Sequence, residues 1–441
     1  MSVVNLTNVD GSLGVNGSAG PAGSISIGNI NLDNYPYSLT GNNLYINIDR
    51  NTTNFYTNNL DINSYNNLSS GMDQGVSTLT FDSCGNLYAG GSFITAGGII
   101  CNYIAKWNGI SWSSLGTGTD NNVLKLTFDI SGNLYAGGTF TNAGGVTCNR
   151  IAKWNGSVWS SLNTGMNSIV ETLTFDSSNN LYAGGSFITA GGVSCIRIAK
   201  WNGSVWSPLG SGINNTVYAL TCDISGNLYA GGTFLTAGGV TCNRIAKWNG
   251  LSWSSLGTGM DNTVLALKCD SSGNLYAGGA FTTAGGVSCN RIAKWNGSSW
   301  SSFGSGMNNT VTTLTFDSFG NIYAGGGFTT AGGITCNRIA KWNGSLWSSL
   351  GPGMDQGVNG LTFDSSNNLY VCGNFISAGN VPCNRIAKLI ISKSMSNSLK
   401  DLYSINLYAN NKLIYPSMVK NNITNITVTD VNTSYSTLVY Y

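Results

Sequence analysis

The chain has 441 residues, of which only 9% are charged, and its formal net charge is +2. This near neutrality gives no electrostatic reason to expect nucleic acid or an acidic membrane surface as a partner. Apolar residues make up 41% and aromatic residues 11% of the chain, which argues against disorder. No apolar run reaches the ~18 residues of a membrane helix. The first residues also lack the basic and apolar regions of a conventional secretory signal, so we expect neither feature.

The N-terminal segment, residues 1–57, is rich in Asn, Gly, Ser and Thr. It contains short alternating runs at Ser24–Ile27 and Asn43–Ile48, which predict short strands between turns. We therefore expect a β arm or small β appendage.

From residue 58 onward a repeat of 47 residues dominates the sequence, and it recurs seven times without an insertion. Its marker is the run Gly-Asn-Leu-Tyr-Ala-Gly-Gly, followed by a glycine-broken loop and Cys-Asn-Arg-Ile-Ala-Lys-Trp-Asn-Gly. The marker tyrosines are Tyr88, Tyr135, Tyr182, Tyr229, Tyr276, Tyr323 and Tyr370. A repeat of this length indicates one continuous architecture in place of several domains.

Each repeat offers four candidate strands and two tight turns. In the second copy the strands are expected at Val123–Phe128, Leu134–Phe140, Arg150–Trp154 and Val158–Leu162. The turns are Asp129–Asn133, where Asp and Gly favour a turn, and Asn155-Gly156. Four short antiparallel strands per unit predict one blade of a β-propeller, and no part of the unit has helical periodicity.

The order hydrophobic strand, Gly-Gly, loop, aromatic residue and then Trp resembles the kelch-type repeat. The likeness covers residues 64–391 and implies a galactose-oxidase-type propeller. The chain departs from kelch at Lys-Trp-Asn-Gly, where that family more often has Tyr-Asp-Pro. The near-identical units in an Asn-, Ile- and Tyr-rich chain also resemble repeat proteins of giant amoeba-infecting DNA viruses.

The two ends of the repeat array predict how the ring closes. The seventh copy has Leu389 in place of the first Trp, and no second Trp follows. Counting one repeat back from Trp112 reaches Tyr65, so the N-terminal segment is expected to supply the missing fourth strand of the last blade. Such a closure leaves no open sheet edge.

Residues 392–441 leave the repeat but keep β-type alternation, as at Asn422–Thr429. Both flanks leave the same blade, so we expect them to pair. The predicted fold class is all-β: a seven-bladed propeller of four-stranded repeats, closed by an N-terminal strand, with a small β module built from both termini. The predicted domains are an N-terminal arm (1–57), the propeller (58–391) and a C-terminal segment (392–441) paired with the arm.

Seven of the eleven cysteines occupy one repeat position, which is expected to be a small buried site. Disulfides are not expected, because equivalent positions in neighbouring units should lie beyond the ~7 Å Cα separation of a bridge. Cys84, Cys222, Cys269 and Cys372 are irregular, and Cys222 and Cys269 replace a core Phe. The regular set is Cys101, Cys148, Cys195, Cys242, Cys289, Cys336 and Cys383.

The chain has no histidine, which removes Ser-His-Asp and Cys-His catalysis and the usual zinc and copper sites. Glu171 is the only glutamate, so a glycosidase would have to use two Asp. Departures from the repeat at Thr119, Asn163, Pro208 and Pro352 form no recognisable constellation. We therefore expect no enzyme, and no catalytic, cofactor-binding or metal-binding residue.

Three rings of charged residues follow the repeat. The acidic ring could bind a cation at a loop face or cap its own turns, and the turn interpretation is preferred. The basic rings could form an anion site in a central channel, but charge pairing and aliphatic packing between blades are preferred. By strand alternation, Arg150 should share a face with Trp154 and Lys153 should point the opposite way. The rings are Asp82, Asp129, Asp176, Asp223, Asp270, Asp317 and Asp364; Lys106, Lys153, Lys200, Lys247, Lys294, Lys341 and Lys388; and Arg150, Arg197, Arg244, Arg291, Arg338 and Arg385, with Tyr103 in the first copy.

Twelve tryptophans, two in each of six copies, could stack on sugars but are better explained by packing between blades. They are Trp107, Trp112, Trp154, Trp159, Trp201, Trp206, Trp248, Trp253, Trp295, Trp300, Trp342 and Trp347. Glycosylation is conceivable at the sequons of Asn155, Asn202, Asn296, Asn343, Asn422 and Asn425.

Low charge, rigid repetition and missing catalytic groups favour a structural protein that assembles with copies of itself. The resemblance to giant-virus repeat proteins implies a component of a virion surface, a filament or another extracellular assembly. The alternative is a binding module that recognises a glycan or another surface protein through one loop face. Neither hypothesis involves nucleic acid, a cofactor or insertion into a membrane.

Overall fold

The computed structural model describes the backbone of residues 62–391 and of short strands in both flanks, with side chains over 65–390. Chain contacts divide the protein into two units, Asn58–Ser392 and the paired flanks Met1–Thr57 with Lys393–Tyr441. In the part of the chain described here, no helix is long and apolar enough to cross a membrane.

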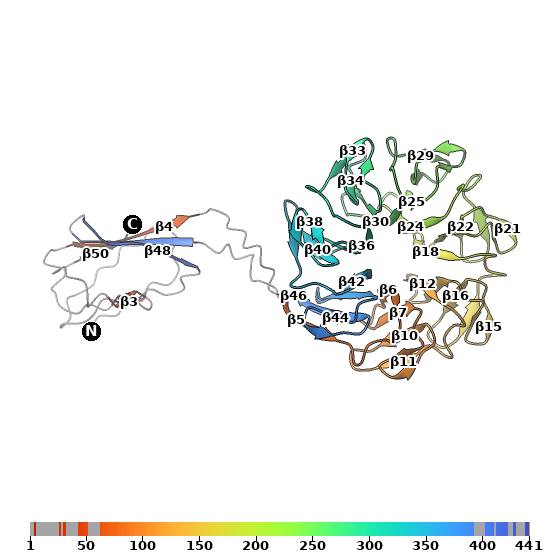
Figure 1. The fold of residues 1–441 in the computed structure, drawn as a ribbon, viewed down its shortest axis with the longest axis horizontal. Coiled ribbons are helices and arrows are strands. Elements are labelled where there is room, and N and C mark those ends of the chain that lie inside the picture. The colour runs from red at the N-terminus through yellow and green to blue at the C-terminus, as the bar shows by residue number, and fades with distance from the viewer. Residues whose placement is uncertain are drawn as a thin grey trace. The chain divides into compact units, whose positions relative to one another are not determined.

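Residues 62–391 form a seven-bladed β-propeller (Figure 1). In the second blade the strands run from the centre outward as β12 (Val123–Phe128), β13 (Leu134–Gly138), β16 (Ile151–Trp154) and β17 (Trp159–Ser161), all antiparallel. The sequence-predicted strands are thus confirmed, although the second and fourth end earlier than expected. The 47-residue repeat is one blade.

The other blades repeat this order. The first is β6 (Val76–Phe81), β7 (Leu87–Gly91), β10 (Ile104–Trp107) and β11 (Trp112–Ser114). The third is β18 (Val170–Phe175), β19 (Leu181–Gly185), β22 (Ile198–Trp201) and β23 (Trp206–Pro208). The fourth is β24 (Val217–Cys222), β25 (Leu228–Gly232), β28 (Ile245–Trp248) and β29 (Trp253–Ser255).

The fifth is β30 (Val264–Cys269), β31 (Leu275–Gly279), β34 (Ile292–Trp295) and β35 (Trp300–Ser302). The sixth is β36 (Val311–Phe316), β37 (Ile322–Gly326), β40 (Ile339–Trp342) and β41 (Trp347–Ser349). The seventh is β42 (Val358–Phe363), β43 (Leu369–Gly373), β46 (Ile386–Ile391) and β5 (Ile62–Asn67).

The Gly-Gly pair that six of the seven repeats share explains how blades pack so closely. A Cβ added at Gly137 on β13 would lie 2.6 Å from Cγ1 of Val170 on the inner strand of the next blade. A Cβ at Gly138 would collide with the carbonyl oxygen of Asn122 in its own blade. Glycine therefore admits a buried valine from the neighbouring blade and the backbone of its own blade.

A short hairpin in each blade was not predicted from the sequence. In the second blade it consists of β14 (Asn142–Ala143) and β15 (Val146–Thr147), joined through Gly144 and Gly145 at φ 60° and 85°. The other hairpins are β8 (Thr95–Ala96) with β9 (Ile99–Ile100), β20 (Thr189–Ala190) with β21 (Val193–Ser194), β26 (Thr236–Ala237) with β27 (Val240–Thr241), β32 (Thr283–Ala284) with β33 (Val287–Ser288), β38 (Thr330–Ala331) with β39 (Ile334–Thr335), and β44 (Ser377–Ala378) with β45 (Val381–Pro382). In Figure 1, β15, β21 and β33 lie at the rim of the ring.

The expectation that Arg150 continues the third strand is wrong. Arg150 has φ 65°, and its N–H donates to the carbonyl of Phe140 at 2.7 Å, which ends the loop before β16 begins at Ile151. Strand alternation therefore does not relate Arg150 to Trp154.

The predicted closure is confirmed. Strand β5 pairs antiparallel with β46, and Tyr65 stands opposite Leu389. The Tyr65 hydroxyl donates to the carbonyl of Leu350, just as Nε1 of Trp347 donates to the carbonyl of Phe303 at 3.1 Å. The N-terminal strand thus takes the place of a tryptophan strand.

The flanks form a small β module of their own. Its main sheet has the order β48 (Lys412–Asn421), β47 (Leu402–Ala409), β4 (Asn43–Asn51) and β50 (Thr437–Tyr440). Two smaller sheets are β1 (Val4–Asn5) with β49 (Thr427–Val428), and β2 (Ser26–Ile27) with β3 (Ile30–Asn31). The strand expected at Asn422–Thr429 is described only at Thr427–Val428.

We predict that Tyr65→Phe lowers the free energy of unfolding by about 1 kcal/mol, because the Leu350 carbonyl loses its donor. Urea unfolding of the whole chain, followed by tryptophan fluorescence, measures the change. Tyr65→Trp, the residue of the other blades, is the matched control and should retain most of the stability. Equal stability of Tyr65→Phe and the native chain would contradict the role of this hydroxyl in closure.

Candidate binding site in the central channel

The tryptophans belong to the framework that joins the blades. Nε1 of each second tryptophan donates at 2.9–3.2 Å to the carbonyl that follows the outer strand of the preceding blade, as Trp159 does to Leu115. The two tryptophans of one blade stack with ring centroids 5.2–5.3 Å apart. The second tryptophans are buried, so their faces are occupied by protein.

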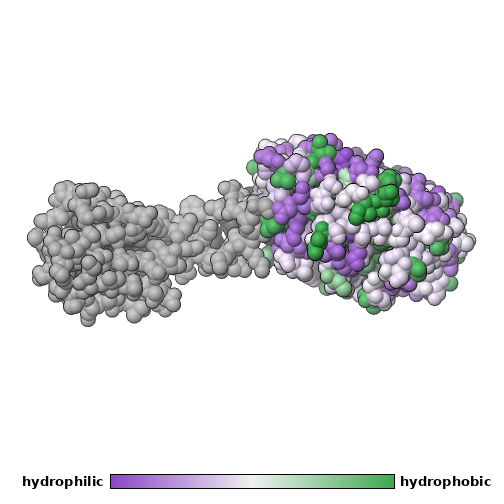
Figure 2. Space-filling view, turned by 90° about the horizontal axis from the view of Figure 1, so that it is seen from below, coloured by the Kyte–Doolittle hydropathy of each residue, from purple (hydrophilic) through white to green (hydrophobic). Residues whose placement is uncertain are grey.

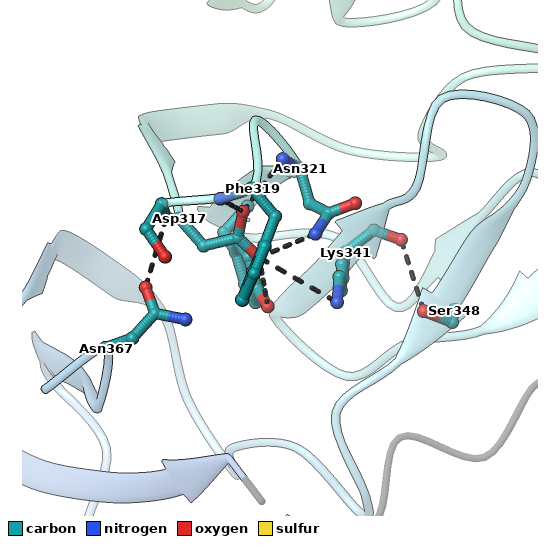
Figure 3. Close-up of polar contacts among 8 residues, drawn as sticks. Asp317, Phe319, Asn321, Lys341, Ser348 and Asn367 are labelled. Carbon is teal, nitrogen blue, oxygen red and sulfur yellow. Dashed lines mark hydrogen bonds and ion pairs between the residues drawn. The ribbon is translucent and has the colours of Figure 1, made fainter. Parts of the chain in front are cut away.

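The acidic and lysine rings meet in a repeated cluster within each blade, shown for the sixth blade in Figure 3. Asp317 accepts from the N–H groups of Phe319 and Asn321, each at 2.9 Å, and from the Tyr323 hydroxyl at 3.2 Å. Lys341 lies 5.5 Å from the centroid of the Tyr323 ring and 3.9 Å from the Asp317 carboxylate. Burial, helped by the Asp317 charge, raises the pKa of Tyr323.

These contacts place both rings in structural roles. The carboxylates cap their turns, and each lysine stacks on the marker tyrosine of its own blade at 5.2–5.6 Å. The lysines lie on the third strand from the centre, away from the channel, and their charge pairing lies within one blade. Over residues 65–390, no group of three Cys, Asp or Glu is arranged to hold a metal ion.

The arginines and cysteines also serve the backbone and the core. Arg338 and Arg385 donate from Nη1 to loop carbonyls, to Gly327 at 2.7 Å and to Asn374 at 2.9 Å. All eleven cysteines are free thiols, and the seven regular ones are buried, as the repeat spacing predicted. Burial raises the pKa of the Cys148 thiol to about 11, which keeps it protonated near neutral pH.

Four of the possible glycosylation sites lie in exposed hairpin turns. The Asn155 side-chain oxygen caps its turn by accepting from the N–H groups of Ser157 at 3.0 Å and Val158 at 2.9 Å. Asn202, Asn296 and Asn343 cap their turns in the same way. Asn422 and Asn425 lie outside the described residues.

The strongest asymmetry of the ring lies on its inner strands, which stand around the central axis of the ring (Figure 1); we call the region that they enclose the central channel. The residue after the first valine of each inner strand is half-buried and differs from blade to blade. We call these residues the upper row: Ser77, Leu124, Glu171, Tyr218, Leu265, Thr312 and Asn359. Six residue types occupy this one position, whereas the Tyr, Cys and Lys positions of the repeat are invariant.

Polar members of the upper row bond across blade boundaries. Asn359 donates from Nδ2 to the Val76 carbonyl at 3.1 Å, and Thr312 donates to the Val358 carbonyl at 2.5 Å. Glu171 occupies the same position in the third blade, and burial raises the pKa of its carboxyl. Sequence reasoning noted Glu171 as the only glutamate but did not recognise this row.

Two lysines also reach the channel from opposite sides. Lys125 follows Leu124 on β12 of the second blade, and Lys268 lies on β30 of the fifth blade. Lys125 is half-buried, whereas Lys268 is exposed to solvent. The protein around Lys268 is nevertheless dense enough that burial lowers its pKa. Burial, together with the charge of Lys268, lowers the pKa of Lys125 from 10.5 to about 8. Since the second and fifth blades are not neighbours, the two charges interact across the channel.

The ring of aromatic contacts is interrupted next to Lys268, whereas both junctions of the blade that carries Lys125 are complete. At five blade junctions a phenylalanine packs edge-on against the marker tyrosine of the preceding blade at 5.0–5.2 Å, as Phe175 does on Tyr135. At the two remaining junctions Cys222 and Cys269 take the place of the ring. Both thiols are partly exposed, and Cys269 follows Lys268 directly. The smaller side chains remove ring volume in the sector of Lys268.

The seventh blade carries a matched exchange of side chains. In the first blade Thr78 stands opposite Gly90, but in the seventh Gly360 stands opposite Cys372. A Cβ added at Gly360 would lie 2.8 Å from Sγ of Cys372, so the thiol fills the space that the inner-strand residue vacates. Cys372 is fully buried, and burial raises the pKa of its thiol.

The comparisons with known proteins show the fold alone. No family model and no curated protein matches the sequence. The structure is similar to the extracellular domain assigned to a hybrid two-component system of B. thetaiotaomicron, with TM-score 0.53, 14% identity, and coverage of 75% of this chain and 40% of that chain. A second such domain from that organism gives a TM-score of 0.52 at 11% identity, and the match covers 86% of this chain and 57% of that chain. YCF48 bound to D1 peptide gives a TM-score of 0.50 at 12% identity, with coverage of 76% of this chain and 98% of that chain.

The chain thus spans less than two thirds of the length of the extracellular domains that it matches. The shared feature is the β-propeller, at identities of 11–14%. These likenesses confirm the propeller fold but do not distinguish a kelch-like repeat from other propeller types.

We predict that Lys125→Thr, which copies Thr78 and Thr172 of other blades, stabilises the protein by about 1–3 kcal/mol at pH 7. The folded state binds the Lys125 proton more weakly than the unfolded state, so the native lysine destabilises the fold fully below pH 8. The gain should shrink as pH rises through 8 towards 10.5, where both states lose the proton. Urea unfolding at pH 7 and pH 10 measures it, and Lys106→Thr is the control. If the gain in the free energy of unfolding were the same at both pH values, it would contradict the interpretation that the charge of Lys125 destabilises the fold.

We also predict that Cys222→Phe raises the free energy of unfolding by about 0.5–1.5 kcal/mol, because the ring restores the contact with Tyr182. The reverse change at a complete junction, Phe175→Cys, should lower it by about 1–3 kcal/mol. Thermal unfolding compares the two variants. If Cys222→Phe were instead destabilising, the space left by the ring would already be filled.

Proposed function

We propose that this chain is a non-enzymatic recognition module that binds its ligand in the central channel of the propeller. The observation that carries the proposal is where the blades differ. The framework positions repeat almost unchanged, whereas the upper row and the two channel lysines change from blade to blade. A binding site for an asymmetric ligand needs such differences at one place, and concave sites with a few polar groups are typical of ligand binding.

The strained charge of Lys125 supports the same proposal. Threonine fits the equivalent position of neighbouring blades, so the fold does not require a lysine there. Residues that reduce stability without a structural partner are commonly functional. The kelch-like type of the repeat, suggested by the motif order, is part of this proposal.

A second candidate is the self-assembling scaffold, which exposed apolar side chains on the blade tips favour. Ile110, Ile130 and Leu251 are 84%, 83% and 88% exposed, although sibling blades carry serine at these positions. Figure 2 shows hydrophobic side chains in separate patches on one side of the propeller. Under this candidate the chain associates with copies of itself in an extracellular assembly, a filament or a virion surface, with sugars on its sequons.

The test compares two variants in which residues are replaced by those at the equivalent positions of other blades. The channel variant carries Lys125→Thr, Glu171→Thr, Tyr218→Thr and Lys268→Thr. The tip variant carries Ile110→Ser, Ile130→Ser, Ile224→Ser and Leu251→Ser. A thermal-shift screen of sugars, amino acids, short peptides and inorganic anions is run on both and on the native chain.

A compound that shifts the melting temperature of the native chain and the tip variant, but not that of the channel variant, is the expected result. Negative-stain electron microscopy of the same samples reports assembly. Ordered arrays that disappear in the tip variant, together with no compound that separates native chain from channel variant, would overturn the proposal in favour of the scaffold.

A further inference from the structure

Lys125 and Lys268 are each the single long side chain of their row on the inner strands. The other residues at the Lys125 position are Thr78, Thr172, Ala219, Ala266, Thr313 and Gly360. The other residues at the Lys268 position are Thr80, Thr127, Thr174, Thr221, Thr315 and Thr362. The two lysines thus lie on inner strands of non-adjacent blades, in rows that are otherwise occupied by small side chains.

No carboxylate neutralises this pair within residues 65–390. The ion pairs found there join Lys341 with Asp317 and Lys388 with Asp364, both in the framework clusters. Glu171 lies on the neighbouring strand β18 but makes no ion pair with Lys125 in the described side chains. The charge that acts on Lys125 near neutral pH is that of Lys268, which repels it, because the buried Cys372 thiol keeps its proton and is neutral.

A bound anion would remove the strain that these two charges create. It would lie between like charges that now repel, in a confined space where electrostatic attraction is stronger than in bulk water. The six threonines in the row of Lys268 are half-buried and offer hydroxyl groups as additional donors.

We infer that the central channel binds a compact oxyanion, such as sulfate or phosphate, between Lys125 and Lys268. This inference rests on the proposed function and names the ligand class of that site. Beside Lys268, Cys269 stands where five other blades have a phenylalanine ring.

Binding should weaken in alkali because Lys125 loses its proton. The titratable groups that act on Lys125 are Lys268 on β30 and Cys372 on β43, and Glu171 lies on the adjacent inner strand β18. Burial raises the pKa of Cys372, so this thiol keeps its proton between pH 7 and 9.5. At pH 9.5 a lysine with a pKa of about 8 is only about 3% protonated.

The experiment is equilibrium dialysis of the full chain against radiolabelled sulfate at low ionic strength. Sulfate is the probe because it keeps its double charge from pH 7 to 9.5. We expect saturable binding of one sulfate per chain, weakened about tenfold or more at pH 9.5. Lys125→Met and Lys268→Met should each weaken binding at pH 7 by about tenfold, since each removes one charge-assisted contact. Lys106→Met, which keeps both channel lysines, should retain the native affinity and pH profile.

Sulfate binding that is absent, or that survives both channel substitutions, overturns the inference. If sulfate does not bind while another compound still separates the native chain from the channel variant, the recognition module stands and only its ligand class is wrong. If sulfate binding is lost equally with Lys106→Met, the anion is attracted by overall charge and both the site and its ligand fail. Melting temperatures of every variant confirm that each one is folded.

Discussion

The whole ring depends on the approach of one valine to one glycine. At six of the seven junctions the inner-strand valine packs on the bare backbone of the preceding blade, at a point where any side chain would collide, as Val170 does at Gly137. At the junction of the seventh and first blades Cys372 takes the place of this glycine. Because the contact recurs around the ring, the blade spacing is fixed and each inner strand is held at the edge of the channel. The tryptophan and tyrosine contacts act further out and make the same junctions rigid.

That rigidity divides the molecule into a symmetric frame and an asymmetric lining. Framework side chains contact one another, as in the Asp317–Tyr323–Lys341 cluster, and are therefore not available to bind a ligand. The lining residues make few such contacts, and Lys125 is held against an electrostatic penalty. A framework that is stable enough can tolerate an unfavourable charge at its centre. This is the physical basis for the proposal that the channel binds a ligand.

Much of the fold follows from the sequence, because the same strand and turn pattern occurs in each of the seven copies. The period, the four strands and the place of Tyr65 in the closing strand could all be predicted from spacing. The hairpin at Asn142–Thr147 could not, since two-residue strands leave no periodic pattern, and the positive φ of Arg150 runs against the preference of a side chain with a Cβ. The channel lining was also missed, although its signal was present: the positions of Glu171 and Lys125 vary from blade to blade, whereas the Tyr, Cys and Lys positions of the repeat do not. The constant positions of the repeat predict the framework, and the variable positions on the inner strands need a separate comparison between blades.

The closing strand has a consequence for how the protein is made. Asn384 donates to the carbonyl of Ser70 at 2.9 Å, and these residues lie 314 positions apart in the chain. During synthesis the first strand of the ring emerges early, but its partner β46 emerges last. Until then the growing blades form an open arc with two exposed sheet edges, which are prone to pairing with other chains. A chain that ends before residue 386 therefore lacks β46 and cannot close the ring, so its early strand β5 has no partner in the seventh blade.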